Sequence, residues 1–169
     1  MKSIIALATL AASALAQSVN IGAPADMSTV TPGNNITVQV NRPVGVPHTP
    51  FNPTRPAPPR LTAIQNTLTG SEEVAIAIGL FPCSGADGQP ASCAGTNTTG
   101  VLGTVLYNGP YEPQYADGAP SLPPHQNFSI QVPATFKSGQ VSLGVAHFAL
   151  VGASMMPIYE FVNTTLVVQ

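Results

Sequence analysis

The chain has 169 residues, of which only 7% are charged, and its formal net charge is −2. So few Lys and Arg residues disfavour a nucleic-acid-binding protein, which needs clustered cations. Eighteen prolines and fifteen glycines disfavour a helical bundle and favour short strands joined by turns.

Residues 1–16 have the three regions of a secretory signal peptide. Lys2 precedes an apolar run over 4–12, and Ala14-Leu-Ala16 is an A-x-A cleavage site. The run is too short to span a bilayer, and no later segment is long and apolar enough to do so. We therefore expect this peptide to be removed, residues 17–169 to form a single β-sandwich domain, and the protein to be secreted and extracellular, without a membrane span.

Short runs rich in β-branched residues predict about seven strands. The alternation of apolar and polar residues is strictest at 35–40 and 126–132. Within 72–81, alternation places Val74 on the apolar face, and the small residues of the other face predict an interior strand. Such strands without a helix predict an all-β fold, an immunoglobulin-like antiparallel β-sandwich. The predicted strands are residues 19–21, 35–40, 72–81, 101–107, 126–132, 141–151 and 158–168.

Residues 42–60 are predicted to form a Pro/Arg-rich surface loop. Its prolines exclude a helix or a central strand, and Arg42, Arg55 and Arg60 make the loop basic. Two interpretations are open: a docking loop for an aromatic groove, or an elaborated surface connection without a partner.

The chain has two cysteines, Cys83 and Cys93. In a secreted protein an even number of cysteines favours a disulfide, and the glycines and proline between them let the segment turn back. A metal site is the alternative, but it would need two further ligands, which the neighbouring sequence lacks. The sequence therefore predicts a Cys83–Cys93 disulfide.

Four N-x-S/T sequons predict glycosylation, at Asn35, Asn97, Asn127 and Asn163. Three of them lie on the polar face of a predicted strand, and the fourth lies in a loop. The same alternation turns Tyr159 and Phe161 outward. These two aromatic side chains are either covered by a neighbouring loop or form a contact surface.

The titratable residues do not form a recognisable catalytic or metal-binding motif. The histidines, His48, His125 and His147, are not spaced as a metal pair, and no serine lies in a G-x-S-x-G elbow. We expect His147, in an apolar strand, to be a hydrogen-bonded structural residue rather than a catalytic one.

The carboxylates are similarly scattered. Glu72 and Glu73 are adjacent on a strand, so they point to opposite faces and cannot flank one glycosidic bond. Glu160 lies on the apolar face of its strand, where it pairs with Lys137 or His147 or is turned outward by a bulge. The sequence thus predicts no catalytic residues, no bound metal, no cofactor and no enzymatic activity.

Three segments resemble a known family. SEEVAIAIGL (71–80), NFSIQVP (127–133) and the stretch 138–168 resemble the fungal necrosis-inducing secreted protein effectors. Members of this family have a signal peptide, a Pro-Gly turn before an early strand, here Thr31-Pro-Gly33, and an ending of the form G-x-x-x-L … F-x-L-x-G-A … P. The loop 42–60 departs from the shorter members.

The resemblance implies an effector that acts on plant tissue or inside the host cell. Such effectors bind receptor-associated immune kinases of the host and suppress pattern-triggered immunity, and some provoke cell death. The resemblance implies no catalytic residues. The alternative is a secreted cell-wall or carbohydrate-binding module, which would bind glycans through exposed aromatic residues. The candidates for that role are Tyr107, Tyr111, Tyr115 and Tyr159.

Overall fold

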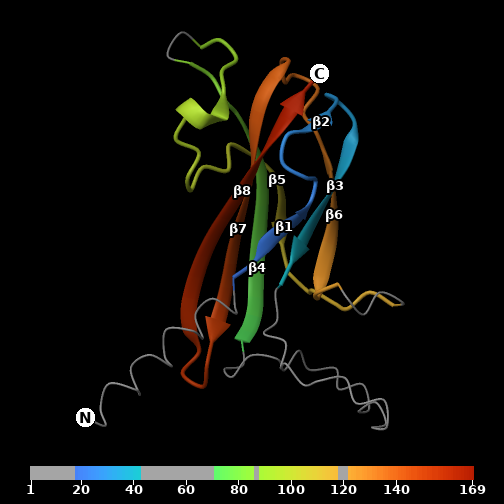
Figure 1. Ribbon diagram of the computed structural model, residues 1–169. Helices are drawn as coiled ribbons and strands as arrows, with labels where there is room; N and C mark the ends of the chain where they lie inside the picture. Colours follow the sequence, from blue (N-terminus) through green and yellow to red (C-terminus); the bar gives the residue numbers. More distant parts are fainter. Residues whose placement is uncertain (1–17, 43–70, 86–87, 118–121) are drawn as a thin grey trace, which may run out of the picture.

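The computed structural model describes residues 18–42, 71–85, 88–117 and 122–169. They form two stacked β-sheets (Figure 1) with the strand orders β1-β3-β6 and β2-β8-β7-β4-β5. The strands are β1 (Asn20–Ala23), β2 (Ser28–Val30), β3 (Asn35–Asn41), β4 (Ser71–Pro82), β5 (Thr104–Gly109), β6 (His125–Gln131), β7 (Gly139–Val151) and β8 (Met156–Val168). The predicted all-β sandwich is confirmed, and the predicted interior strand, β4, lies between β7 and β5.

The helical content of the described residues is one short 3₁₀ turn, Cys93–Gly95. None of the described helical segments has the length and hydropathy needed to cross a membrane. The predicted signal peptide and the Pro/Arg-rich loop beyond Arg42 lie outside the described residues.

The core lies between the two sheets, where the apolar faces of the strands meet. Val38 of β3 pairs in register with Phe128 of β6, and Ile36 pairs with Ile130, so the strict alternation of these strands packs one face of each inward. The five-stranded sheet contributes the facing layer. Its buried apolar residues include Ile76, Ile78, Leu80, Val141, Leu143, Val145 and Leu166.

A β-bulge in β4 changes the face on which its first residues lie. The register to β7 shifts between Glu73 and Ala75, and the strand therefore shifts its alternation at this point. Val74 is 40% exposed, so its predicted inward position was wrong. The prediction that Glu72 and Glu73 point to opposite faces agrees with the structure, in which Glu72 is exposed and Glu73 points into the sandwich.

Strand β2 was missed by the sequence analysis because three residues are too short to show a period. It pairs in parallel with the end of β8, Ser28 opposite Leu166 and Val30 opposite Val168. The carboxylate of Asp26 fixes this pairing by accepting hydrogen bonds from the Thr165 backbone N–H at 3.0 Å and the Thr164 hydroxyl at 3.1 Å. Strand β8 is therefore an interior strand over its last three residues.

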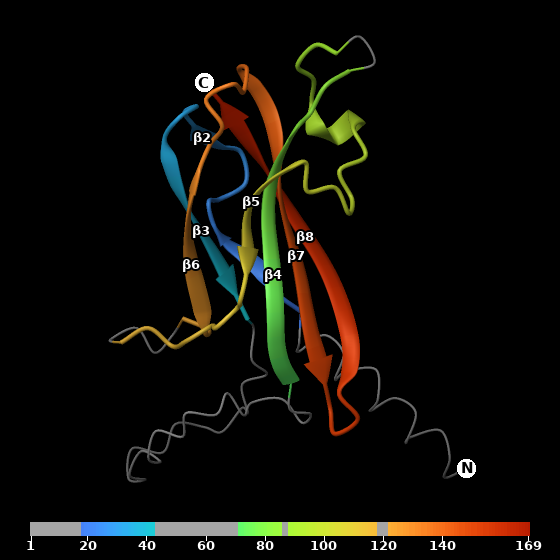
Figure 2. The ribbon, with the colours of Figure 1, turned by 180° about the vertical axis from the view of Figure 1, so that it is seen from behind.

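Among the described residues, a chain segment covers the outer face of the five-stranded sheet near its upper end, the end at the top of Figure 2. There the segment 101–103 crosses the sheet over Gly79, where a Cβ atom would lie 2.4 Å from the Leu102 carbonyl oxygen. Beside this crossing the predicted Cys83–Cys93 disulfide is formed, with an S–S distance of 2.04 Å. The lower half of the same face carries no crossing segment among the described residues.

Replacing Gly79 with alanine should lower the free energy of unfolding by about 1–3 kcal/mol, because the added methyl group meets backbone rather than a movable side chain. Gly95→Ala is the matched control, since nothing lies within 4 Å of a Cβ atom there. Urea unfolding of both variants measures the difference. Equal midpoints for the two would contradict the close crossing.

Candidate functional site

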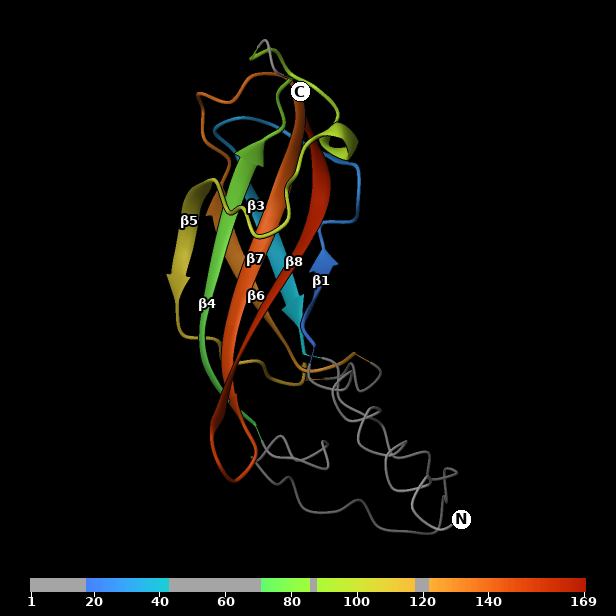
Figure 3. The same ribbon diagram turned by 90° about the vertical axis from the view of Figure 1, so that its left-hand side faces the viewer.

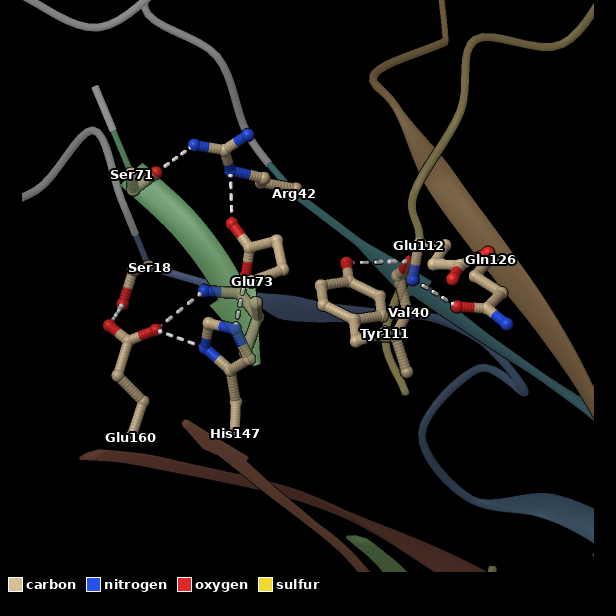
Figure 4. Close-up of polar contacts among 11 residues, drawn as sticks. Ser18, Val40, Arg42, Ser71, Glu73, Tyr111, Glu112, Gln126, His147 and Glu160 are labelled. Carbon is tan, nitrogen blue, oxygen red and sulfur yellow. Dashed lines mark hydrogen bonds and ion pairs between the residues drawn. The ribbon is translucent and has the colours of Figure 1, made fainter. Parts of the chain in front are cut away.

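A cluster of polar side chains is buried between the two sheets, at the end of the sandwich where β4 begins and β7 ends. Figure 4 shows its contacts. Arg42 follows β3, Glu73 lies on β4, His147 on β7 and Glu160 on β8. The guanidinium Nε of Arg42 lies 2.8 Å from Glu73 Oε1, and its Nη2 donates to the Ser71 hydroxyl. Arg42 is 2% exposed and His147 is 1% exposed, so these charges interact away from bulk water.

His147 joins the two carboxylates of this cluster. Its Nε2 contacts Glu73, and its Nδ1 lies 3.2 Å from Glu160 Oε2. Glu160 also accepts hydrogen bonds from the Ser18 hydroxyl at 2.8 Å and the Val19 backbone N–H at 3.2 Å. The cluster therefore connects both sheets and the segment that precedes β1.

These contacts keep His147 protonated. Burial of the imidazole lowers its pKa, but hydrogen bonds to Glu160 and Glu73 outweigh burial and raise the pKa to about 9. Burial of the Glu160 carboxyl raises its pKa, but hydrogen bonds from His147, Ser18 and Val19 outweigh burial, so the net pKa is lowered. The cluster thus pairs two cations, Arg42 and His147, with the carboxylates of Glu73 and Glu160.

Tyr111 closes the cluster on the side of the apolar core. Its ring stands edge-on to His147 with the centroids 5.4 Å apart, and its hydroxyl donates to the Val40 carbonyl at 3.2 Å. Burial raises the pKa of Tyr111 well above its ordinary value. Among the described residues, every buried side-chain nitrogen and oxygen has a hydrogen-bond partner. The cluster is therefore saturated by its own members, which is typical of a structural network.

The cluster corrects one prediction and decides two others. Arg42 was predicted to be part of an exposed basic loop, but its backbone N–H donates to the Pro124 carbonyl and its side chain turns into the sandwich, so this prediction was wrong. Glu160 pairs with His147, one of its three predicted alternatives, and His147 is hydrogen-bonded as expected. Arg55, Arg60 and His48 lie outside the described residues. Within the described part of the chain, no group of three or more His, Cys, Asp or Glu side chains is arranged to hold a metal ion.

The open surface of the molecule lies on the other side of the same strands. We use the term outer patch for six outward residues in the lower halves of β4, β7 and β8 (Figure 3): Ala75, Ala77, Ala146, Phe148, Tyr159 and Phe161. Tyr159 is the most exposed of them, at 64%. A shallow hollow of about 230 Å³ is lined by the three alanines, by Phe148 and Tyr159, and by Asn108 and Gly109 at the end of β5. The residues that line the hollow include no exposed charged side chain.

The two aromatic residues predicted to face outward differ in exposure. Tyr159 projects from the sheet, whereas Phe161 is half-buried and its ring lies against Gly144, where a Cβ atom would be 2.8 Å from Phe161 Cζ. Phe148 pairs with Tyr159 across β7 and β8 and is also exposed. Phe148 was not among the predicted contact residues, although the alternation of 141–151 already placed it opposite the buried residues of that strand.

The residues considered for glycan binding do not form one surface. Tyr111 is 1% exposed, so its proposed place in an exposed aromatic platform was wrong. Tyr107 packs on Phe128 with the ring centroids 4.6 Å apart and donates its hydroxyl hydrogen to the Pro110 carbonyl. Tyr115 and Tyr159 are exposed. These four tyrosines, all of them in the described part of the chain, therefore do not form one platform for stacking on a sugar chain.

The four sequon asparagines are all exposed. Asn35 and Asn127 lie on the outer face of the three-stranded sheet, and Asn97 lies in a loop. Asn163 lies above the outer patch, and its Nδ2 donates to Thr98 Oγ1 at 2.8 Å and to Ser142 Oγ at 3.3 Å. Their glycosylation stays a prediction, and none of them lies within the outer patch.

Fold and site together define a small two-sheet β-sandwich with a saturated ionic network inside and an uncharged, partly aromatic patch outside. Comparison with known protein families then places it: the sequence pattern of the Nis1 family matches residues 57–167, and the chain belongs to the Nis1 family. The resemblance found in the sequence is confirmed at this level, and the family indicates an effector-like protein.

Among solved structures, the chain is similar to a cellulose-active polysaccharide monooxygenase from M. thermophila. The two share 10% sequence identity with a TM-score of 0.47, and the match covers 86% of this chain and 54% of the enzyme. This chain thus spans about half the length of that enzyme. A search among curated proteins found no significant match.

Proposed function

We propose that this protein is a secreted fungal effector that acts without catalysis by binding immune receptor-associated kinases of a plant host. Binding would suppress pattern-triggered immunity and, in some tissues, induce cell death. The observation that carries the proposal is membership of the Nis1 family across residues 57–167, which include β4 to β7 and nearly all of β8. The disulfide and the predicted signal peptide support secretion.

A role by contact is also supported by where the polar groups lie. The buried ionic side chains of the polar cluster bind each other inside the sandwich. The outer patch, in contrast, presents Tyr159 and Phe148 to solvent. Exposed aromatic residues beside a hollow are typical of the centre of a protein–protein interface. We therefore place the kinase contact on the outer patch.

The test is a pull-down with purified kinase domains of plant immune receptors and their associated cytoplasmic kinases. The wild-type protein should retain a kinase and reduce its autophosphorylation, and Tyr159→Ser should weaken binding at least about tenfold, as loss of an interface aromatic does. Tyr115→Ser is the matched control, because Tyr115 is 47% exposed and lies outside the outer patch. A wild-type protein that retains no kinase would contradict the function, and equal weakening by both variants would contradict the surface.

A further inference from the structure

The four sequon asparagines differ in how many hydrogen atoms of the side-chain amide are already bound. Asn163 donates two hydrogen bonds from Nδ2, and Asn35 donates one. Asn97 and Asn127 donate none from Nδ2 to another described residue. We propose that the secreted protein carries N-glycans at Asn35, Asn97 and Asn127 only, and that Asn163 instead ties the loop before β5 to the five-stranded sheet.

N-glycosylation needs an amide hydrogen that points to open space. The amide nitrogen bonds to C1 of a lipid-linked oligosaccharide, the C1–O bond to the lipid diphosphate breaks, and one amide hydrogen leaves as a proton. The sugar then occupies the direction in which that hydrogen pointed. Because the amide is planar and has two N–H directions, an asparagine whose two N–H groups both point at protein atoms has no place for a sugar.

Both N–H directions of Asn163 are occupied by protein atoms. Its Nδ2 lies 2.8 Å from Thr98 Oγ1 and 3.3 Å from Ser142 Oγ, so a sugar ring in either direction would overlap one of these side chains. Turning the amide out to solvent would break both hydrogen bonds. Ser142 is 1% exposed, and a buried hydroxyl that loses a partner cannot replace it with water. The folded protein therefore either keeps these contacts or carries a glycan here, and not both.

The other two residues of this sequon are also held in the sheet. The Thr164 hydroxyl and the Thr165 backbone N–H both donate to the carboxylate of Asp26. The Thr165 carbonyl accepts a hydrogen bond from the Met27 backbone N–H at 2.7 Å. Once the sheet has formed, β8 therefore offers no free segment around Asn163.

The other three sequons lie where a glycan would displace no buried contact. Asn97 is in a loop, and its Oδ1 accepts a hydrogen bond from the Thr99 backbone N–H at 3.2 Å, a contact that uses the amide oxygen and not the nitrogen. Asn127 lies on β6, at the edge of the three-stranded sheet. Asn35 is the first residue of β3 and keeps one N–H after its hydrogen bond to Ser129. All three asparagines are exposed, so an attached sugar would meet solvent.

The contacts of Asn163 lie at the boundary between the covered and the open half of the outer face. Gly144, its partner on β7, lies under the crossing segment, where a Cβ atom would be 3.2 Å from the Val101 carbonyl oxygen. Phe161 of the outer patch lies two residues away, on the same face of β8. A glycan on Asn163 would therefore extend over the surface to which we assign kinase binding. That consequence rests on the proposed function, whereas the assignment of the glycans does not.

The experiment is peptide mass spectrometry of the protein secreted from a yeast host and trimmed with endoglycosidase H, which leaves one N-acetylglucosamine on each occupied asparagine. The peptide that contains Asn163 should be unmodified, and the three other sequons should each carry the sugar. Thr165→Ala and Thr99→Ala are matched variants, since each removes the hydroxyl residue of one sequon and keeps its asparagine. Thr99→Ala should lose one glycan from the intact mass, and Thr165→Ala should lose none.

A second measurement tests the contacts of Asn163 directly. Asn163→Ala should lower the urea concentration at the unfolding midpoint further than Thr165→Ala, because only the first variant removes the hydrogen bonds to Thr98 and Ser142. A sugar on Asn163 in the folded secreted protein overturns the proposal, as does an unmodified asparagine in any of the other three sequons. Equal midpoints for the two variants also overturn it. A protein with the expected glycans that retains no kinase contradicts the proposed function alone.

Discussion

Replacing Arg42 with alanine is expected to lower the free energy of unfolding by about 3–5 kcal/mol, the cost of leaving one partner of a buried ion pair without the other. Arg42 is 2% exposed and lies 2.8 Å from Glu73, which is itself shielded from solvent. Its loss also removes the hydrogen bond to Ser71. Urea unfolding followed by circular dichroism measures the change.

The exposed Lys137 provides the matched cation control. Lys137→Ala should change the free energy of unfolding by less than about 0.5 kcal/mol, as surface substitutions do. A double variant, Arg42→Met with Glu73→Gln, removes the charge of both partners and should recover part of the loss. If Arg42→Ala unfolds at the same urea concentration as Lys137→Ala, the ion pair does not hold the sheets together.

The stability of the protein should fall by about 3 kcal/mol as the pH rises from 6.5 to 9, because the pKa of His147 is 6.5 in the unfolded chain and about 9 in the folded one. His147 binds its proton more tightly in the folded protein than in the unfolded chain. Its contribution to the free energy of unfolding is therefore complete below pH 6.5 and is lost as the pH rises through the folded pKa. Urea unfolding at a series of pH values measures this slope.

Two variants test the assignment of this slope to His147. His147→Gln should flatten the fall between pH 6.5 and 9, whereas His125→Gln, outside the cluster, should leave it unchanged. At acid pH, Glu160 has the opposite effect, because folding lowers its pKa. Its contribution to the free energy of unfolding is present above pH 4.5 and is lost as the pH falls through the folded pKa. Stability should therefore be highest between these two ranges, and an equal slope in both histidine variants would disprove the role of His147.

Much of the fold could be predicted because it depends on local alternation. The inward positions of β3 and β6 follow from a period of two, and Glu160 was recognised as the carboxylate on an apolar face. Arg42 is in phase with Val38 and Val40, so the same period, continued past β3, places its side chain on the buried face; it was mispredicted because it was assigned to the Pro-rich loop. Glu73 could not be placed in this way, because it points inward through a bulge in β4.

The outer patch, too, could be predicted only in part from the sequence. Alternation predicted that Tyr159 faces outward, and it could have found Phe148. It could not show that the segment 101–103 covers the upper part of the sheet and leaves the lower part open, because that crossing depends on the close approach of two backbones at Gly79.

The parallel pairing of β2 with β8 has a consequence for how the protein is made. The first strand of the five-stranded sheet in the sequence binds the last of the described strands, so this sheet cannot be completed until β8 has been synthesised. Pairings between such distant segments form slowly. We therefore expect the five-stranded sheet to stay incomplete until β8 has been synthesised, a state that can still be threaded through an export channel.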